Sequence, residues 1–348
     1  MIQDKTVALT HRPRRLRATP ALRELVAETH LRPQDFVAPY FVVSGTNITE
    51  PIGSLPGVSR LSPDLLLRDL ERGLKLGVRA AMLFGVVPNE TKDPSGKRAS
   101  DPHGPVPQAL RAARRAFGND LVLMTDVCLC GYTDHGHCGL LRSTPRGVII
   151  DNDPSLAALG EMAVMHAEAG ADLVSPSDMM DGRVGYLRGA LDHSGFQDTG
   201  ILAYTVKYAS AFYGPFRDAA GSVPKGGAVA DSAARPPSDR KTYQMDFRNP
   251  REARLEIALD AAEGADLLMV KPALAYLDIL YQMRQLSSLP LVAYHVSGEY
   301  AALKAAAAAG ALGEAAATHE SLTAIKRAGA DLIISYYALE AAEKGWLD

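Results

Sequence analysis

Short apolar runs alternate with longer segments of mixed polarity along most of the chain. Continuous runs of this length are typical of strands buried on both faces, as in parallel sheets. Between them, Ser62-Pro63 and Asp153-Pro154 place a capping side chain before a proline, which is how many helices begin. We predict strands at 36–43, 80–84, 121–125, 173–175, 201–206, 267–270, 291–296 and 332–335. We predict helices at 63–76, 153–169, 184–193, 250–263, 276–285 and 338–344, with a further one ending near 117.

Eight strands alternating with helices predict an α/β fold, and two features favour a closed (β/α)8 TIM barrel over an open doubly wound sheet. The sequence Gly-Ala-Asp-Leu recurs at 170–173, 264–267 and 329–332, so these helix-to-strand joints are short, with glycine ending each helix. The strand-to-helix loops are longer. No Gly-x-Gly-x-x-Gly follows any predicted strand, as a dinucleotide-binding open sheet would require.

The first 34 residues differ from the rest of the chain. They are rich in Arg and Pro and carry only a short helical patch near 20–29. Such a segment has no core of its own, so we expect an extended N-terminal arm at 1–34 that packs on a neighbouring subunit. A frayed tail is the alternative. The catalytic barrel is then expected at 35–348, with an active-site lid at about 208–245.

Composition narrows the class of protein. Among 348 residues, 22% are charged and the formal net charge is −3, which argues against a nucleic-acid binder. No apolar run approaches the roughly 18 residues that span a membrane. The N-terminus also lacks the apolar core of a signal peptide. We therefore expect a cytoplasmic protein, in which the three cysteines do not form a disulfide framework.

Two lysines follow neighbouring strands at the barrel end where catalytic groups lie. Lys207 follows the strand at 201–206, and Lys271 follows the strand at 267–270. Paired strands lie roughly 4.8 Å apart, so the two amines should share a pocket and lower each other's pKa. A neutral amine attacks carbonyls, which predicts a Schiff-base nucleophile. The alternatives are lysines at the rim of a pocket that bind an acid, or that extend to water. Other reactive side chains at strand ends are Asp126, Ser177, Ser297 and Tyr336.

All three cysteines fall on one polar, glycine-rich loop. Cys128 and Cys130 follow the strand at 121–125, and Cys138 comes after His135 and His137. Three thiolates can hold zinc and leave a fourth position open, which is the pattern of a catalytic site. A structural zinc site completed by one of the two histidines is the alternative.

The segment after Lys207 combines aromatic and cationic side chains. Phe212, Tyr213 and Arg217 come first, and Arg240 and Gln244 follow a stretch at 221–237 that is rich in Gly, Ala and Pro. Rings beside guanidinium groups suit a lid that closes over a carboxylate. Charged loops are often merely solvated, so this signal is weak by itself.

Four motifs resemble those of one enzyme family. They are Asp-Val-Cys-Leu-Cys-Gly-Tyr-Thr at 126–133 with His-Gly-His-Cys-Gly at 135–139, Ser-Pro-Ser-Asp-Met-Met-Asp-Gly-Arg-Val at 175–184, Ser-Ala-Phe-Tyr-Gly-Pro-Phe-Arg at 210–217, and Met-Val-Lys-Pro at 269–272. Together they resemble porphobilinogen synthase (5-aminolevulinate dehydratase), and the resemblance runs in order from Arg12 to the C-terminus. It implies a TIM-barrel lyase that condenses two 5-aminolevulinate molecules to porphobilinogen with loss of two waters. That reaction is an early step of tetrapyrrole (haem) biosynthesis.

The resemblance also assigns roles to residues. It implies that Lys271 forms a Schiff base with the substrate that becomes the propionate side of the product, and Lys207 with the substrate that becomes the acetate side. The three cysteines match zinc ligands. Further residues match groups around the substrates: Asp126 and Ser177 near the propionate-side amine, Ser297 and Tyr336 at the propionate-side carboxylate, and Arg217, Arg240 and Gln244 at the acetate-side carboxylate.

The resemblance implies metals and an assembly as well. Some relatives use magnesium or no active-site metal, but the thiolates here favour zinc. Glu252 resembles the acid that binds an allosteric magnesium at a subunit interface, although a glutamate in the first turn of a helix is also common for electrostatic reasons. A homo-octamer with arms wrapped around neighbours is expected.

Two other functions would fit a barrel. A class I Schiff-base aldolase needs one lysine and no cysteine loop. A catalytically inactive barrel kept for assembly or metal storage would show a degraded site. The cysteine loop argues against the first and the filled site positions against the second.

Overall fold

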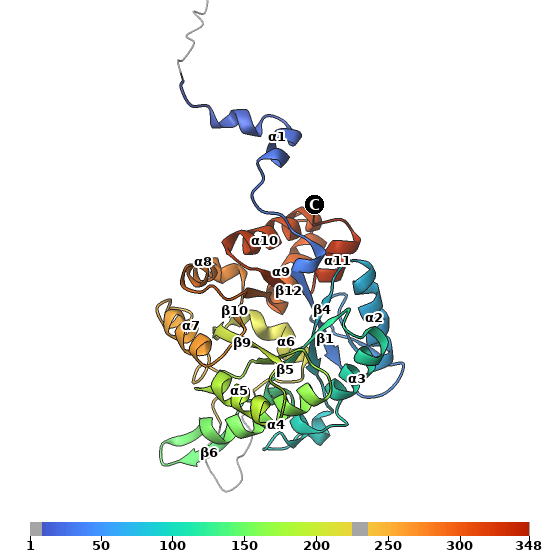
Figure 1. Ribbon diagram of the computed structural model, residues 1–348, viewed down its shortest axis with the longest axis vertical. Coiled ribbons are helices and arrows are strands. Elements are labelled where there is room, and N and C mark those ends of the chain that lie inside the picture. Colours follow the sequence, from blue (N-terminus) through green and yellow to red (C-terminus); the bar gives the residue numbers. More distant parts are fainter. Residues whose placement is uncertain (1–8, 225–235, 348) are drawn as a thin grey trace, which may run out of the picture. The chain divides into compact units, whose positions relative to one another are not determined.

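Eight parallel strands form a closed ring at the centre of the computed structural model, which describes residues 9–224 and 236–347 (Figure 1). The ring is closed because β12 pairs back with β1. This confirms the predicted (β/α)8 barrel. In order around the ring, the strands are β1 (Phe36–Val42), β4 (Ala80–Gly85), β5 (Val122–Val127), β8 (Leu173–Pro176), β9 (Gly200–Lys207), β10 (Leu267–Lys271), β11 (Leu291–His295) and β12 (Leu332–Ser335).

Helices surround the ring in Figure 1. They are α2 (Pro63–Lys75), α3 (Pro105–Phe117), α4 (Asn152–Glu168), α5 (Arg183–His193), α6 (Gly214–Ala219), α7 (Glu252–Ala262), α8 (Leu277–Leu286), α9 (Ser297–Ala308), α10 (Glu314–Ala328) and α11 (Ala338–Glu343). The predicted helices are found with their ends shifted by at most two residues. Across the described ranges, no helix combines the length and the apolar character needed to cross a bilayer.

The repeated Gly-Ala-Asp joints have a common structural role. Their glycines, at 170, 264 and 329, take positive φ angles of 107°, 102° and 123°, which glycine adopts without steric cost. The aspartate that follows accepts a backbone N–H from the preceding strand of the ring. Asp172 binds Leu123, Asp266 binds Ile201 and Asp331 binds Leu291, each at 2.7 Å. The joints therefore fix the register at the amino-terminal end of the barrel, away from the strand ends that carry lysines.

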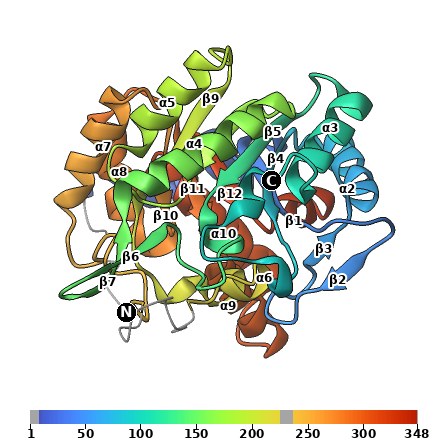
Figure 2. The same ribbon diagram turned by 90° about the horizontal axis from the view of Figure 1, so that it is seen from below.

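Two β-hairpins lie outside the predictions. They are formed by β2 (Thr49–Pro51) with β3 (Ser59–Leu61), and by β6 (Leu140–Thr144) with β7 (Gly147–Asp151). Their residues are mostly exposed or half-buried, so no apolar run marks them. Figure 2 shows the hairpins at well-separated places. The first one is attached to the ring, since β3 pairs with β1 at Phe41–Arg60 and Val42–Leu61.

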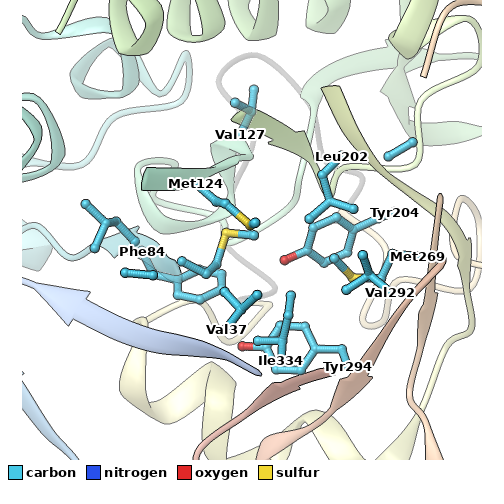
Figure 3. Packing of buried hydrophobic residues seen from close by; sticks show 14 of the residues in the cluster. Val37, Phe84, Met124, Val127, Leu202, Tyr204, Met269, Val292, Tyr294 and Ile334 are labelled. Atoms are coloured by element: carbon cyan, nitrogen blue, oxygen red, sulfur yellow. The ribbon is translucent and has the colours of Figure 1, made fainter. Parts of the chain in front are cut away.

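The interior of the ring is filled by side chains. Figure 3 shows residues from different strands converging there, including Met124, Leu202, Tyr204, Met269 and Tyr294. Each of these five is at most 2% exposed. A barrel packed in this way is a core and not a pore, so chemistry is confined to its ends.

The N-terminal residues form a unit of their own that ends at His30. It contains a 3₁₀ turn at Pro13–Arg17 and the short helix α1 (Pro20–Leu25). Thr19 caps α1 by accepting the Leu22 backbone N–H at 3.2 Å. None of the described residues 9–30 is buried. The division falls four residues before the predicted boundary because Leu31 is already buried in the larger unit.

Candidate active site

Lys207 and Lys271 stand directly opposite each other, as paired residues of β9 and β10. A β-bulge makes this possible. Between the pairs Ala203–Leu268 and Val206–Val270, β9 uses three residue steps where β10 uses two. Tyr204 and Met269 both point into the barrel (Figure 3), and in a regular strand Lys207 would then face the helices. The extra residue turns Lys207 back to the same side as Lys271.

Lys271 lies in a pocket walled by aromatic rings. Its side chain is buried, and its Nζ lies 4.1 Å from the ring centroid of Tyr294, 4.8 Å from that of Phe216 and 5.0 Å from that of Tyr204. Burial, followed by the nearby charge of Lys207, lowers the pKa of Lys271 to about 7. A substantial fraction of this amine is therefore neutral near neutral pH.

Lys207 has polar partners in place of a full aromatic wall. Its Nζ donates a hydrogen bond to the carbonyl oxygen of Ser177 and lies 5.4 Å from the Tyr204 ring. Ser177 follows β8, and its own N–H binds the Val127 carbonyl at 3.1 Å. The Ser177 carbonyl thus fixes the position of the Lys207 amine, whose charge acts on Lys271.

Asp126 lies between the lysines and the cysteine loop. The strand β5 runs two residues beyond its predicted end, so Asp126 belongs to the strand and is half-buried. Burial and the neighbouring Cys130 raise the pKa of Asp126 to about 6, although Lys207 and a hydrogen bond from Ser177 act in the opposite direction. This carboxyl group is able to gain and lose a proton near neutral pH.

The three cysteines form one buried cluster whose sulfur atoms all lie within 4.8 Å of one another. Within the described part of the chain, this is the one group of His, Cys, Asp or Glu side chains close enough to hold a metal ion. Three thiols in such proximity fit a soft divalent ion such as zinc, with a fourth position left for another ligand. Lys207 is near enough to lower the pKa of Cys130, after the larger effect of hydrogen bonds from the other two cysteines.

Neither histidine of the loop joins the cysteine cluster. His137 directs Nδ1 to the hydroxyl of Tyr243 at 3.1 Å and Nε2 to the carbonyl of Pro237 at 2.8 Å. His135 directs Nε2 to the carbonyl of Pro94 at 3.3 Å. The alternative of a structural site completed by a histidine is therefore not supported by the positions of these rings.

Two arginines and a glutamine gather on the lid segment. Arg240 is buried, and its Nη2 donates to the carbonyls of Gly136 at 2.9 Å and Ser222 at 2.7 Å. Burial and the charge of Arg240 lower the pKa of Arg217. Gln244 is 3% exposed, and neither its Oε1 nor its Nε2 has a hydrogen-bond partner; the same is true of Nε in both arginines. Buried polar atoms without partners are rare, so this group is suited to receive a polar ligand.

The second predicted carboxylate clamp lies across the site. Ser297 begins α9, and its hydroxyl accepts the Phe216 N–H at 3.0 Å and donates to the Phe212 carbonyl at 3.3 Å. The Tyr336 hydroxyl lies 3.4 Å from that of Tyr294. Phe212 contacts Ser297 through its backbone while its side chain is 40% exposed.

Tyr213 lies next to Lys271, whereas Glu252 lines another cavity. Tyr213 is buried and donates its hydroxyl to the Lys271 carbonyl at 3.0 Å. Glu252 begins α7 and is outside the lysine pocket. It lines a separate cavity of about 530 Å³ together with Asp181, Gln244 and Glu256. Burial raises the pKa of Glu256 to about 7, with Glu252 among the charges that add to this effect.

The sequence reasoning missed three aromatic residues of the site. Tyr204 and Tyr294 were assigned only to strands, and Phe216 was treated only as part of a motif. Tyr204 and Tyr294 share one signal, an aromatic side chain within three residues of a strand end, whereas Phe216 lies in α6 and has no such signal. Such a signal identifies a wall of the site only once the fold is known.

Comparisons with known proteins agree with one another. A family model described as delta-aminolevulinic acid dehydratase matches residues 10–344. The delta-aminolevulinic acid dehydratase of Chlamydia pneumoniae is 49% identical over 344 residues, which are 98% of this chain and 99% of that protein. The Bacillus subtilis protein of that name is 48% identical over 337 residues, 97% of this chain and 98% of its own length.

A solved structure extends the likeness to the fold. It is the crystal structure of delta-aminolevulinic acid dehydratase (porphobilinogen synthase) from Toxoplasma gondii in complex with the reaction product porphobilinogen. The two chains align with a TM-score of 0.90 and 46% sequence identity, over 97% of this chain and 92% of the other.

The pKa of Lys271 leads to a testable prediction. Cyanate reacts with neutral amines, so its rate of reaction with Lys271 should rise with pH and reach half of its maximum at about pH 7. Peptide mass spectrometry after timed exposure measures the rate, with the exposed Lys75 as an internal reference for the reagent. A rate for Lys271 that still rises steeply above pH 9 would show that its amine is not held in the neutral form.

Proposed function

This chain belongs to the delta-aminolevulinic acid dehydratase family, and on that premise we propose that it condenses two molecules of 5-aminolevulinate to porphobilinogen. The reaction forms one carbon–carbon and one carbon–nitrogen bond and releases two waters. The observation that carries the proposal is the position of two lysine amines, at facing strand ends, next to a buried cluster of three thiols. The match of the family model to residues 10–344 supports the same reaction.

Lys271 is the nucleophile of the first step in this proposal. Its neutral amine attacks the ketone of one substrate, and loss of water leaves a Schiff base. The aromatic rings around Nζ disfavour the charged amine through burial and exclude water that would reverse the step. Asp126, with a pKa of about 6, is placed to accept or return the protons of this step.

Lys207 holds the second substrate. The charge of Lys207 lowers the pKa of Lys271, and in this proposal the Lys207 amine forms the second Schiff base. A hydrogen bond to the Ser177 carbonyl holds its Nζ in place. Two amines in one pocket thereby activate two carbonyls in turn.

Two different polar groups distinguish the carboxylates of the two substrates. Arg217, Arg240 and Gln244 offer cations and unpartnered amide atoms, which suits the acetate-side carboxylate. Ser297 and Tyr336 offer hydroxyl groups for the propionate-side carboxylate. Identical substrates are then held in different orientations, as an ordered condensation requires.

The cysteine cluster is the proposed zinc site. Cys128, Cys130 and Cys138 would hold Zn²⁺ through their thiolates, and the ion would act as a Lewis acid toward a substrate oxygen. Residues of the chain supply the surroundings: Tyr243 packs against the three sulfur atoms, and Lys207 and Arg240 favour the thiolate form of Cys130.

We further propose that the chain acts as a homo-oligomer, an octamer in the family pattern. Leu16 and Leu25 of the N-terminal unit are 52% and 79% exposed, and apolar residues in such a short segment favour contact with another subunit. Glu252, in its acidic cavity, is the proposed ligand of an allosteric magnesium.

Trapping with borohydride tests the Schiff base. Reduction in the presence of 5-aminolevulinate should attach substrate covalently to the peptide that contains Lys271, because an imine is reduced to a stable amine. The substitution Lys271→Ala should lower the rate of porphobilinogen formation by roughly a thousandfold or more. Lys241→Ala, which removes an exposed lysine of the lid segment, is the matched control and should retain activity. An adduct found only on other peptides would refute the assignment.

Removal of the thiols tests the metal site. The triple substitution of Cys128, Cys130 and Cys138 by alanine should abolish zinc binding and activity together, since no other side chains in the described residues form such a group. Zinc content per chain, measured by atomic absorption, is the readout that does not depend on activity. A folded triple variant, checked by circular dichroism, that retains the zinc content of the parent would reject the site.

The role of Glu252 is tested separately. Glu252→Ala should abolish any stimulation of porphobilinogen formation by magnesium while zinc content stays the same, because none of the three cysteines lines the cavity of Glu252. Glu320→Ala, an exposed glutamate of α10, serves as the control. Equal stimulation in the Glu252 variant and its parent would leave Glu252 as an ordinary helix-start glutamate.

A further inference from the structure

The carboxyl-terminal end of the short helix α6 is held by an arginine from a distant part of the chain. Arg60 donates from Nε to the Ala219 carbonyl at 2.7 Å and from Nη2 to the Asp218 carbonyl at 2.9 Å. These carbonyls lie in the last turn of the helix, and that of Asp218 also accepts the Gly221 backbone N–H at 3.2 Å. The chain just beyond is held in a similar way, since Lys92 donates to the Gly221 carbonyl at 2.6 Å.

Arg60 is itself fixed to the barrel wall. It lies in β3 and pairs with Phe41 of β1, a ring strand. Its Nη1 lies 3.5 Å from a carboxylate oxygen of Glu50, on the other strand of the hairpin. Ser54, in the turn of the same hairpin, donates to the Asp218 carboxylate at 2.6 Å. The β2–β3 hairpin thus joins α6 to the rigid part of the molecule at two places.

The helix that Arg60 holds carries groups of the active site. The Phe216 ring lies over Lys271 Nζ, and it also packs on the rings of Phe41 and Phe84 at centroid distances of 5.5 and 5.1 Å. Arg217 is the next residue and belongs to the acetate-side clamp. Neither Arg60 nor Ser54 lines the lysine pocket, so any influence on the reaction passes through α6.

Little room is left under the Phe216 ring. The cavity bounded by Asp126, Cys128, Cys130 and Phe216 has a volume of about 10 Å³, which is close to the space of one water molecule. Neither lysine lines this cavity. A substrate next to the cysteine cluster therefore needs more space than this position of Phe216 leaves.

We propose that Arg60 is a positioning residue for the reaction, which holds α6 closed so that Phe216 covers Lys271 and Arg217 meets a substrate carboxylate. The inference rests on the proposed function, because it assigns Arg60 a part in that same site. Loss of Arg60 lowers the fraction of molecules with α6 closed. The apparent affinity for substrate falls in proportion to that fraction.

A second consequence concerns the pKa of Lys271. With α6 open more of the time, water reaches Lys271 and the effect of burial on its pKa is weaker. The pKa then rises from about 7 toward that of an ordinary lysine, and less of the amine is neutral at pH 7. A residue that only stabilised the fold would change the amount of active protein, and neither the KM nor the pH dependence of the molecules that remain folded.

The test compares Arg60→Ala and Arg60→Lys with Arg284→Ala. Arg284 also donates to two backbone carbonyls, those of Ser287 and Leu289, but at the amino-terminal end of the barrel.

We expect Arg60→Ala to raise the KM for 5-aminolevulinate about tenfold, as loss of hydrogen bonds from a charged donor implies. The acid limb of kcat/KM should move to higher pH. Arg60→Lys, which keeps one donor, should lie between it and the parent. Arg284→Ala should alter neither quantity.

Failure of this inference can be separated from failure of the proposed function. If the parent protein gives no borohydride adduct at Lys271, the proposed function falls. If the parent gives the adduct, and Arg60→Ala matches Arg284→Ala in KM and in the position of the acid limb, the role of Arg60 falls alone. Should Arg60→Ala not fold, Ser54→Ala, which removes a single hydrogen bond to Asp218, is expected to give a smaller shift in the same direction. A parental KM and acid limb in a folded Ser54→Ala would overturn the proposal.

Discussion

The facing position of two amines at neighbouring strand ends is the constraint on which the rest of the site depends. It exists because a single extra residue in β9 turns Lys207 to the inner face, opposite Lys271. Without that bulge, Lys271 would pair with Val206, and the side chains of Lys207 and Lys271 would point to opposite faces of the ring. The bulge is therefore more than a local irregularity, since it converts two ordinary strand-end lysines into a coupled pair.

Lys207 and Lys271 have different surroundings. Lys207 satisfies its charge at the Ser177 carbonyl, whereas Lys271 meets the faces of Tyr294, Phe216 and Tyr204. An aromatic face does attract a cation, but here burial outweighs that attraction and the pKa of Lys271 falls to about 7. Two lysines of the same chemistry thus have different partners within one site, and different surroundings are how two like groups can take distinct roles in one reaction.

Features set by neighbouring residues could be predicted from the sequence, whereas contacts between distant segments could not. Apolar runs located all eight ring strands, and the lysines and cysteines were recognised because strand ends meet at one face of a barrel. The bulge in β9 left no mark in the sequence, since it is defined by register against β10. The β2–β3 hairpin was also missed, because Thr49–Pro51 is exposed and too short for a periodic pattern. Its link from Arg60 to α6 joins residues 159 positions apart.

The two ends of the barrel differ in whether their buried polar groups have hydrogen-bond partners. Aspartates of the Gly-Ala-Asp joints are fully engaged at the amino-terminal end, where they fix strand register. At the opposite end, the amide of Gln244 and the Nε atoms of Arg217 and Arg240 are buried and unpaired, which costs stability in the absence of a ligand. A carboxylate-bearing substrate would supply those missing partners, so part of the free energy of its binding comes from relieving that cost. Arg60 contributes from another direction, since it donates to the carbonyls of Ala219 and Asp218 at the end of α6.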